Sequence, residues 1–395
     1  MIFEVKERLR GSMARAGVIK TAHGVIETPA FVAVGTKATV KALTPREIAD
    51  CGANVVLANT YHLYLEPGIE ILKSAGGLGK FMGWGGPTMT DSGGFQIFSL
   101  SGKNRGLKVS SKSGESLEDG EESKTAGGGR SENLVKVSED GVKFRSFIDG
   151  SEHFFTPEKS IEIQNAIGAD IIFAFDHFEY PDAPYDKHEA SLERTSRWAK
   201  RCLERHSAAL EKKEAPEDQA LFGIVQGGRH EALRKRSARE IAGLEFSGFG
   251  IGGSFDKEDM GTAVRWVNEI LPEDKPRHLL GIGEPQDIVE AVKNGCDTFD
   301  CVAPTRAGRT GTLYTSKGKI NIKNAAFRNS FERIDPACDC YTCSNFTRAY
   351  LSHLYRNGEM LAGVLGTIHN LKYIIGVTKS LRESILKGDE SIFSN

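Results

Sequence analysis

The chain contains 395 residues, of which 39% are hydrophobic and 26% charged, so it can bury a core larger than that of one ordinary domain. No apolar run approaches the length of a membrane span, and the first residues lack the pattern of a secretion signal, so we expect a cytoplasmic protein with no membrane partner. The formal net charge of −2 excludes a global field that would attract a polyanion, and nucleic acid would therefore need a local basic patch.

The N-terminal region predicts an antiparallel hairpin, then a helix, then a buried strand. Residues 13–34 alternate apolar and polar side chains around glycines, which is typical of a hairpin. Residues 41–52 predict a helix, because Thr44 is suited to be its N-cap and a proline follows in the first turn. Residues 55–58 are continuously apolar and predict a short strand that ends in a polar segment.

The same order of apolar strand, polar or glycine-rich segment and amphipathic helix recurs along the chain. Continuously apolar strands that alternate with helices favour a parallel sheet covered on both faces. We therefore predict an α/β fold, a (β/α)8 TIM barrel with an N-terminal antiparallel hairpin and a C-terminal zinc-binding subdomain, with an open doubly wound sheet as the alternative. Such a barrel carries its chemistry at the carboxyl ends of its strands. The further strands are expected at 87–90, 171–175, 221–225, 248–251, 279–282 and 298–299.

Two segments interrupt this order. Residues 102–132 are rich in Gly, Ser, Lys and Glu and have no apolar periodicity, so we interpret them as a mobile surface insertion. From Pro336 onward the chain carries clustered cysteines and two further predicted helices. We accordingly predict a catalytic barrel domain at residues 1–335 and a zinc-binding helical subdomain at residues 336–395.

Three carboxylates stand at predicted strand ends, namely Asp91, Asp176 and Asp300, and in a barrel they would converge on one rim. Paired carboxylates on either side of a glycosidic bond can supply a nucleophile and an acid/base. Gln226, with glycine amides beside it, suits hydrogen bonding to the edge of a planar base. Asp176 and His177 could also be metal ligands, but no second histidine is suitably placed, so a hydrogen-bonded structural His177 is the better interpretation.

Residues 248–253 formally match the dinucleotide-binding pattern G-x-G-x-x-G. The match is weak, because the acidic residue expected at ribose-binding distance is not evident. Two structural roles stay open for these glycines instead. They could let backbone N–H groups approach a flat ligand closely, or they could form tight turns at a strand end.

The segment 298–309 places Asp300 directly before a proline and the two arginines Arg306 and Arg309. Taken alone, this arrangement favours an aspartate that caps a turn, with two solvated arginines behind it. Residues 301–330, however, contain six Lys and Arg residues and no acidic residue. In a nearly neutral chain this is a local basic face suited to a phosphate backbone, which favours nucleic acid.

Three of the seven cysteines, Cys338, Cys340 and Cys343, lie within six positions, and His369 could supply a fourth ligand. Three thiolates and one imidazole form a standard closed tetrahedral zinc set, which leaves no position open for water. We therefore predict one structural Zn²⁺ ion per chain. Because the cysteines do not pair evenly and no signal peptide is evident, a reducing compartment fits this pattern.

Taken together, these motifs resemble the tRNA-guanine transglycosylase (queuine tRNA-ribosyltransferase) family, bacterial type, over almost the whole chain. The resemblance is carried by residues 59–63, 91–96, 225–228, 299–301 and 304–306, and by the cysteine cluster with His369. It implies a (β/α)8 barrel whose zinc subdomain docks tRNA. The implied reaction replaces the wobble guanine of a G-U-N anticodon with a 7-deazaguanine, normally the aminomethyl precursor of queuine. Bacterial relatives are homodimers, and no redox or nucleotide cofactor is implied.

The resemblance also implies roles for individual residues. Asp300 matches the nucleophile that attacks the ribose and holds the tRNA covalently, and Asp91 matches the general acid/base. Arg306 and Arg309 match residues that hold the anticodon nucleotide next to the exchanged one. The positions that match base-binding residues are Phe95, Asp176, Gln226, Gly227, Gly253 and Ser254.

The chain departs from the family pattern beside the predicted base pocket. His177 and Phe178 replace the usual Glu-Cys pair, and Ser254 and Phe255 replace a leucine and a small residue. Both pairs border the place of the 7-substituent, so queuine itself stays open as the incoming base. Glu258 still matches the family's carboxylate.

Two other functions stay open at this stage. One is a non-catalytic tRNA-binding subunit, which would be expected to lose the acids at 91 and 300, although both are present. The other is a metal-dependent barrel hydrolase that would use Asp176, His177 and His62. Loss of activity on chelation, with the fold intact, would support the second.

Overall fold

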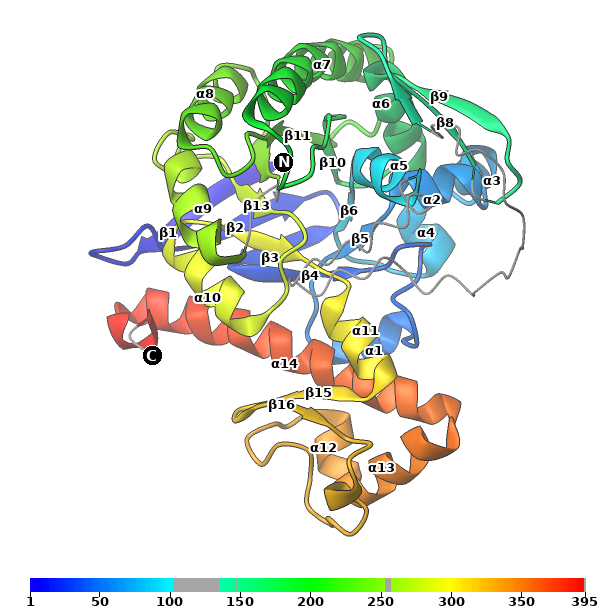
Figure 1. Ribbon diagram of the computed structural model, residues 1–395, viewed down its shortest axis with the longest axis vertical. Helices are drawn as coiled ribbons and strands as arrows, with labels where there is room; N and C mark the ends of the chain where they lie inside the picture. The colour runs from blue at the N-terminus through cyan, green and yellow to red at the C-terminus, as the bar shows by residue number, and fades with distance from the viewer. Residues whose placement is uncertain (102–134, 147, 253–256, 394–395) are drawn as a thin grey trace. The chain divides into compact units, whose positions relative to one another are not determined.

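The computed structural model describes residues 1–101, 135–146, 148–252 and 257–393. Within these residues, eight parallel strands close into a barrel in the order β10-β11-β12-β13-β14-β4-β5-β6 (Figure 1). The predicted barrel is therefore confirmed, and the open sheet is not formed. The barrel strands are β4 (Ala30–Val34), β5 (Val56–Ala58), β6 (Thr88–Thr90), β10 (Ile171–Phe173), β11 (Ala220–Val225), β12 (Gly248–Ile251), β13 (Arg277–Leu279) and β14 (Thr298–Asp300).

Packing inside the barrel explains two glycines of the pattern at residues 248–253. Strand β12 pairs with β11 so that Phe222 lies opposite Gly248 and Ile224 opposite Gly250. A Cβ atom on Gly248 would lie 2.5 Å from the Phe222 ring, and one on Gly250 would lie 2.6 Å from Ile224. A side chain at either position would overlap its neighbour, so these glycines make room for large side chains from the next strand.

The chain divides into two compact units. The first comprises Met1–Ala58, Leu78–Met89 and Pro272–Asn395, and the second comprises Asn59–Gly77 and Thr90–Leu271. The domain boundary predicted between residues 335 and 336 stays a prediction. The insertion predicted at 102–132 lies outside the described residues.

The first unit begins with an antiparallel sheet in the order β1-β2-β3, in which β2 and β3 form the predicted hairpin. The predicted range of 13–34 is too long at its end, because Ala30–Val34 is the barrel strand β4, which pairs in parallel with β14 and β5. In helix α1, Thr44 caps the N-terminus and forms a capping box with Glu47, as its sequence predicts. The elements of this unit outside the barrel are β1 (Ile2–Arg8), β2 (Arg15–Thr21), β3 (Gly24–Thr28), α1 (Pro45–Asp50), α4 (Leu78–Met82), α10 (Pro285–Lys293), α11 (Ala303–Thr310), β15 (Thr312–Thr315), β16 (Gly318–Asn321), α12 (Tyr341–Asn345), α13 (Arg348–Asn357), α14 (Met360–Lys387) and the short 3-10 helices Ala325–Phe327 and Glu390–Phe393.

A buried ion pair joins the N-terminal sheet to the start of β14. The Arg15 guanidinium donates through Nε to Asp297 Oδ1 at 2.9 Å and through Nη2 to Oδ2 at 2.6 Å. Asp297 Oδ2 also accepts the backbone N–H of Arg277 at 2.7 Å, so one carboxylate binds both β2 and β13. Both members of the pair are almost fully buried. Their bidentate geometry is the kind that offsets the cost of removing two charges from water.

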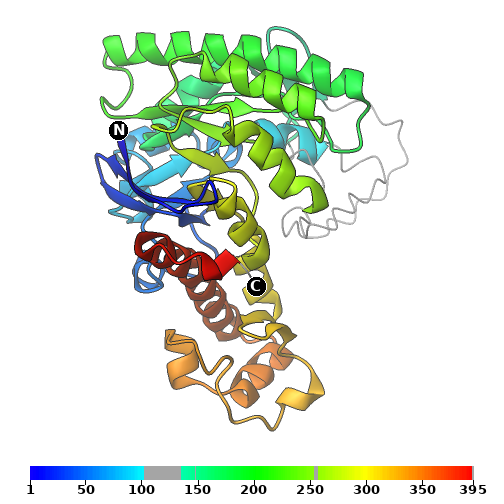
Figure 2. The same cartoon turned by 90° about the vertical axis from the view of Figure 1, so that its left-hand side faces the viewer.

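Helix α14 is the longest described helix of the first unit, and it packs against α10, α11, α12, α13, β4 and β15 (Figure 2). By length and mean hydropathy it is the one described helix that could cross a membrane, a match that the apolar runs of the sequence had not suggested. However, 56% of its most apolar window is buried inside the protein. Its hydrophobicity is therefore explained by its central place in the packing of this unit.

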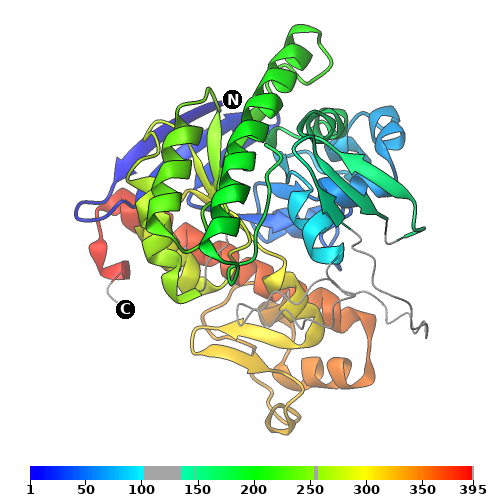
Figure 3. The same ribbon diagram turned by 45° about the horizontal axis from the view of Figure 1, so that its top comes forward.

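The second unit contains a separate antiparallel sheet in the order β7-β8-β9 and the long helix α7 beside α6 and α8 (Figure 3). Glu139, in the β7–β8 turn, binds Arg197 of α7 and accepts the Trp198 indole N–H through its carbonyl at 2.7 Å. These contacts fasten the small sheet to α7. The elements outside the barrel are α2 (Thr60–Leu65), α3 (Ile69–Ser74), α5 (Gly94–Ser101), β7 (Val135–Val137), β8 (Val142–Arg145), β9 (Glu152–Phe155), α6 (Pro157–Ile167), α7 (Tyr185–Glu211), α8 (Glu231–Ala242), the 3-10 helix Lys257–Asp259 and α9 (Met260–Asn268).

Candidate active site and metal centre

Asp300 is the last residue of β14, and its carboxylate is held by one oxygen. Oδ1 lies 3.0 Å from His278 Nε2 and accepts the Gly281 N–H at 3.1 Å. No residue that the structure describes donates a hydrogen bond to Oδ2. The side chain is 15% exposed, so this carboxylate is oriented by the protein and still accessible.

His278 holds Asp300 from the neighbouring strand. Strand pairing places His278 directly opposite Thr298, and the ring Nδ1 lies 2.8 Å from the Thr298 hydroxyl. The histidine side chain is fully buried. The sequence does not identify this residue, because its apolar run predicts the strand at 279–282, two residues beyond the start of the observed β13. A polar residue directly before that apolar run was the available signal.

Asp91 follows β6 and is held through both oxygens. Oδ1 accepts the backbone N–H groups of Thr60 at 3.0 Å and Gly93 at 3.1 Å, and Oδ2 accepts the Asn59 amide. Asn59 also caps helix α2 by accepting the His62 N–H at 3.0 Å. The polar segment after β5 therefore positions Asp91, a role that the sequence did not reveal.

Asp176 lies beyond β10 and forms a buried polar pair with Gln226, which follows β11. Its Oδ2 accepts the Gln226 amide at 2.6 Å, and its Oδ1 accepts the Ser92 hydroxyl at 3.0 Å. Burial raises the pKa of the Asp176 carboxyl, against the hydrogen bonds from Gln226 and Ser92, which lower it. The structure thus brings together two of the predicted base-binding residues and the residue next to Asp91.

Glycines allow these groups to approach one another. A Cβ atom on Gly252 would lie 2.6 Å from the Gln226 amide oxygen, and one on Gly94 would lie 3.0 Å from the Asp176 carbonyl oxygen. Gly227 has a φ of +123°, and a Cβ there would lie 2.7 Å from the backbone nitrogen of Arg234. The predicted residues Gly253 and Ser254 lie outside the described residues, as does Phe255.

The residues on either side of Asp91 are held to α6 by a chain of buried hydrogen bonds. Gln164 of α6 accepts from the Thr90 hydroxyl at 3.1 Å and donates to the Ser160 hydroxyl at 3.1 Å. Ser160 in turn donates to the Ser92 carbonyl at 2.8 Å. This chain ties the end of β6 to α6, and it gives Asp91 and Ser92 little freedom to move.

Aromatic rings line this part of the second unit. Phe95 contacts Phe178 edge-to-face at 5.0 Å between ring centroids, and Phe178 contacts Tyr180 in the same way at 5.4 Å. Phe95 is partly exposed at the start of α5. His177 packs against Phe98 at 5.1 Å.

His177 is a structural side chain. Its Nδ1 lies 3.0 Å from the Arg194 guanidinium, and its backbone N–H donates to the Thr195 hydroxyl at 3.0 Å. Burial and the Arg194 charge lower the pKa of His177 to about 4, so the ring is neutral at pH 7. Among the described residues, Asp176, His177 and His62 do not form a group able to hold a metal ion.

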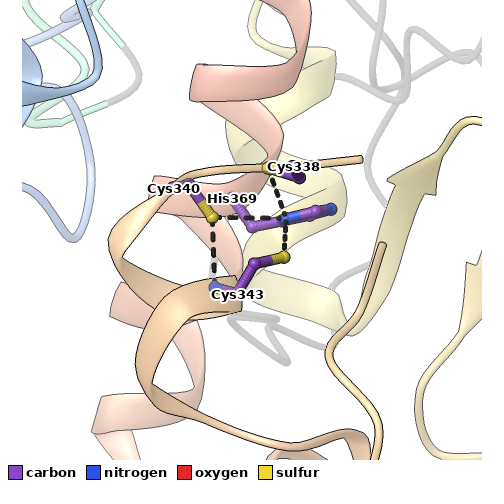
Figure 4. A group of neighbouring side chains, drawn as sticks. All are labelled: Cys338, Cys340, Cys343 and His369. Carbon is purple, nitrogen blue, oxygen red and sulfur yellow. Dashed lines mark hydrogen bonds between the residues drawn. The ribbon is translucent and has the colours of Figure 1, made fainter. Parts of the chain in front are cut away.

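The predicted metal ligands do converge, as Figure 4 shows. The ligand atoms of Cys338, Cys340, Cys343 and His369 all lie within 4.8 Å of one another. The three sulfurs lie 3.7, 3.5 and 3.3 Å from His369 Nδ1. A tetrahedral ion with Zn–S of ~2.3 Å and Zn–N of ~2.1 Å would place S and N about 3.6 Å apart, so the residues fit such an ion.

The histidine of this cluster is held in the orientation that metal binding needs. His369 Nε2 lies 2.6 Å from the Tyr314 carbonyl oxygen, so Nε2 carries the proton and Nδ1 presents a lone pair to the three sulfurs. Four protein ligands complete a tetrahedral shell. The cluster is therefore a candidate metal site with four protein ligands.

The next residue of α14 binds the start of α11, the helix that carries Arg306 and Arg309, and the start of the strand β15 that follows it. The Asn370 amide donates to the carbonyls of Pro304 at 3.0 Å and Thr312 at 2.9 Å. Both arginines are partly exposed, and both take part in polar interactions. Helix α11 starts three residues after Asp300, so α14 fixes the segment that joins the carboxylate to the arginines.

Comparison with known proteins identifies the family. A family model described as "Queuine tRNA-ribosyltransferase" matches residues 10–126 and 125–394. The chain belongs to this family. It is 47% identical to the queuine tRNA-ribosyltransferase of Thermoanaerobacter pseudethanolicus over 94% of this chain and 90% of that protein. It is 47% identical to the protein of the same name from Moorella thermoacetica over 98% of this chain and 94% of that protein, and 45% identical to one from Staphylococcus aureus over 97% and 92%. The predicted family is confirmed, and this member is a pentosyltransferase.

The depressed pKa of His177 predicts how the stability of this family member depends on pH. The unfolded chain takes up a proton at His177 near pH 6.5, whereas the folded protein does so only near pH 4. The neutral ring therefore stabilises the fold fully above pH 6.5, and this contribution is lost as the pH falls toward 4. Its size is about 3 kcal/mol.

We expect His177→Gln to reduce the loss of unfolding free energy between pH 7 and pH 4 by this amount, measured by urea denaturation. His23→Gln, at an exposed histidine in the β2–β3 turn, is the matched control and should behave as the unmodified protein does. Equal acid sensitivity of His177→Gln and the unmodified protein would contradict the assignment.

Proposed function

We propose that the protein exchanges the wobble guanine of G-U-N tRNA anticodons for a 7-deazaguanine through a covalent intermediate with Asp300. The observations that carry the proposal are two oriented carboxylates, Asp300 and Asp91, each held by hydrogen bonds at the carboxyl end of its own barrel strand. A barrel of this type carries its active site at that end of its strands. Membership of the family supports tRNA as the substrate.

In the proposed first step, the Asp300 carboxylate attacks C1′ of the wobble ribose. The C1′–O bond forms as the bond from C1′ to guanine N9 breaks, and the bonding electrons leave with guanine, which Asp91 protonates. In the second step Asp91 removes a proton from the incoming base, whose nitrogen attacks C1′ and releases Asp300. The transition states resemble an oxocarbenium ion, which a nearby carboxylate stabilises.

The Asp176–Gln226 pair supports recognition of the base. Their hydrogen-bonding groups are fixed by one another and by Ser92, so they can contact a base edge without reorganising. Phe95 would stack on the base, and Gly227, Gly253 and Ser254 would add contacts around it. To reach these groups the base must leave the anticodon stack, which a single-stranded loop permits.

The basic run after Asp300 supports tRNA docking. Arg306 and Arg309 would hold the nucleotide next to the exchanged one. Lys319, farther along the run, donates to Glu284 at 2.6 Å and lies over the Tyr314 ring. Residues 301–330 contain six Lys and Arg residues and no acidic residue, and such a local positive charge suits phosphates.

For the incoming base we propose the aminomethyl precursor of queuine, with queuine itself as the alternative. The chain departs from the family pattern at His177 and Phe178, which would border the 7-substituent of the incoming base. Phe178 contacts Phe95, the proposed stacking ring, so it can narrow the space beside the base. Mass spectrometry of the exchanged nucleoside, with guanine, the aminomethyl precursor and queuine in competition, decides between the two bases.

A non-catalytic tRNA-binding subunit is the second candidate. The hydrogen bonds that orient Asp91 and Asp300 favour catalysis, because binding of tRNA alone does not require two carboxylates held in fixed orientations. Tight tRNA binding without exchange of any base would favour the docking role instead.

The nucleophile is tested by trapping the intermediate. Asp300→Asn should abolish the covalent protein–tRNA adduct on denaturing gels, since an amide does not displace the base, while tRNA binding should change little. Asp339→Asn, at an exposed carboxylate, is the control and should form the adduct normally. An adduct that persists in Asp300→Asn would remove this residue from its role.

We propose that the metal of the Cys338 cluster is a structural Zn²⁺ ion. When bound, it would link the segment before α12 to α14 and supply folding free energy. A chelator should lower the melting temperature and release about one zinc per chain by atomic absorption, and Cys343→Ala should reproduce the loss of stability. Unchanged stability after complete removal of zinc would contradict a structural role.

We propose that the chain forms a homodimer in the cytoplasm. Apolar side chains are exposed on α12 to α14, where Phe346 and Tyr350 stack at 5.4 Å and Met360 is 90% exposed. Exposed apolar surface favours a protein partner when it is contiguous. The thiols of the metal cluster favour a reducing compartment, which cell fractionation would check.

Light scattering tests the dimer. Tyr350→Arg should shift the molecular mass toward that of the 43.1 kDa chain, because a buried cation would be desolvated in the interface. Ile71→Arg, at an exposed apolar residue of the other compact unit, should leave the mass unchanged. Equal masses for both variants would place the interface elsewhere.

A further inference from the structure

We propose that His278 is a positioning residue that fixes the Asp300 carboxylate, so that Oδ2 is the oxygen that attacks the ribose. In this view Thr298 holds the ring in the tautomer that carries its proton on Nε2. The inference deepens the proposed function and rests on it. His278 is a buried histidine that is not among the predicted site residues.

The geometry places three side chains in one line across two strands. Thr298 and Asp300 are two residues apart on β14, so their side chains project to the same face of the sheet. His278 lies opposite Thr298 on β13, and its ring spans the distance between them, with Nδ1 2.8 Å from the Thr298 hydroxyl and Nε2 3.0 Å from Asp300 Oδ1.

The two neighbours select one tautomer of the ring. An ionised carboxylate only accepts hydrogen bonds, so the nitrogen that faces Asp300 must carry a proton. The Thr298 hydroxyl can donate as well as accept, and it can therefore satisfy an unprotonated Nδ1. A neutral His278 with its proton on Nε2 makes both contacts at once. It is a general property of histidine that the hydrogen bond made by one ring nitrogen sets which of the two nitrogens carries the proton.

Fixing one oxygen leaves the other for the reaction. Oδ1 accepts hydrogen bonds from His278 and from the Gly281 N–H, and these bonds fix the orientation of the carboxylate. No described residue donates to Oδ2, so its lone pairs are available. In the proposed step, Oδ2 forms the bond to C1′ while the C1′–N9 bond breaks, and Oδ1 becomes the ester carbonyl, which keeps its two donors. The carboxylate needs no rotation during attack, which lowers the reorganisation cost.

The test compares variants by the rate of covalent adduct formation in a single turnover. His278→Phe removes the donor but keeps a ring, and it should slow adduct formation about 10- to 100-fold, the range expected for loss of a hydrogen bond to a charged group. Its dissociation constant for tRNA should change less than about 2-fold. His278→Gln keeps an N–H donor and should restore most of the rate. Thr298→Val should give an intermediate loss, because the ring is then free to change tautomer.

His206→Phe is the matched control, since His206 is also a buried histidine with a hydrogen bond, from Nε2 to the Gln219 carbonyl. It should lower stability without slowing the adduct step. A readout that does not depend on activity is nitrogen-15 NMR of selectively labelled histidine. The signal that disappears in His278→Gln should show an unprotonated Nδ1 and a protonated Nε2.

The outcomes separate this inference from the proposed function. If the unmodified protein forms no covalent adduct, the proposed function fails. If it forms the adduct and His278→Phe forms it equally fast while remaining folded, the positioning role is wrong. If His278→Gln is as slow as His278→Phe, or if NMR finds the proton on Nδ1, the tautomer assignment is wrong.

Discussion

The carboxylate of Asp297 is the constraint on which the nucleophile side of the site depends. It accepts hydrogen bonds from Nε and Nη2 of Arg15 and from the backbone N–H of Arg277. The side chains of Arg15 and Asp297 are almost fully buried. Two charges buried in this way are stable only while all of their bonds are made, and loss of one partner typically costs about 3–5 kcal/mol. The pair therefore fixes the pairing of β13 with β14, and this register sets His278 opposite Thr298, next to Asp300.

The two candidate catalytic carboxylates are held by different means, and the difference matches their proposed roles. Asp300 is bound through one oxygen, which leaves the second available for covalent chemistry. Asp91 is bound through both oxygens, by two backbone N–H groups and the Asn59 amide. A group that only moves protons can keep such bonds throughout the reaction, whereas a nucleophile must give up one oxygen. The two residues are both aspartates, and it is their different hydrogen bonds that suit them to different proposed roles.

The sequence predicted the features that depend on local patterns. Apolar runs located seven of the eight barrel strands, Thr44 located a helix start, and the spacing of three cysteines located the candidate metal cluster, because each is a short-range consequence of hydrophobicity, capping or ligand geometry. Strand β4 was assigned to the hairpin, because its apolar residues follow those of β2 and β3 directly in the chain. The roles of His278 and Asn59 could not be predicted, because they follow from strand register and from contacts between distant segments. The glycines at 248 and 250 show the same limit, since their reason is the size of Phe222 and Ile224 on the adjacent strand.

His369 and Asn370 are consecutive on α14, and this adjacency links two processes that are chemically unrelated. One side chain belongs to the candidate metal cluster, while the next binds a carbonyl at the start of α11, which carries Arg306 and Arg309, and a carbonyl at the start of β15. A ligand that favours the ordered form of such a shared element stabilises it for every other ligand, and the coupling is equal in both directions. The affinity of the cluster for a metal ion and the affinity of α11 for an anionic substrate, both as proposed, should therefore be coupled equally in both directions. A bound polyanion should tighten the hold on the ion as much as the ion tightens the hold on the polyanion.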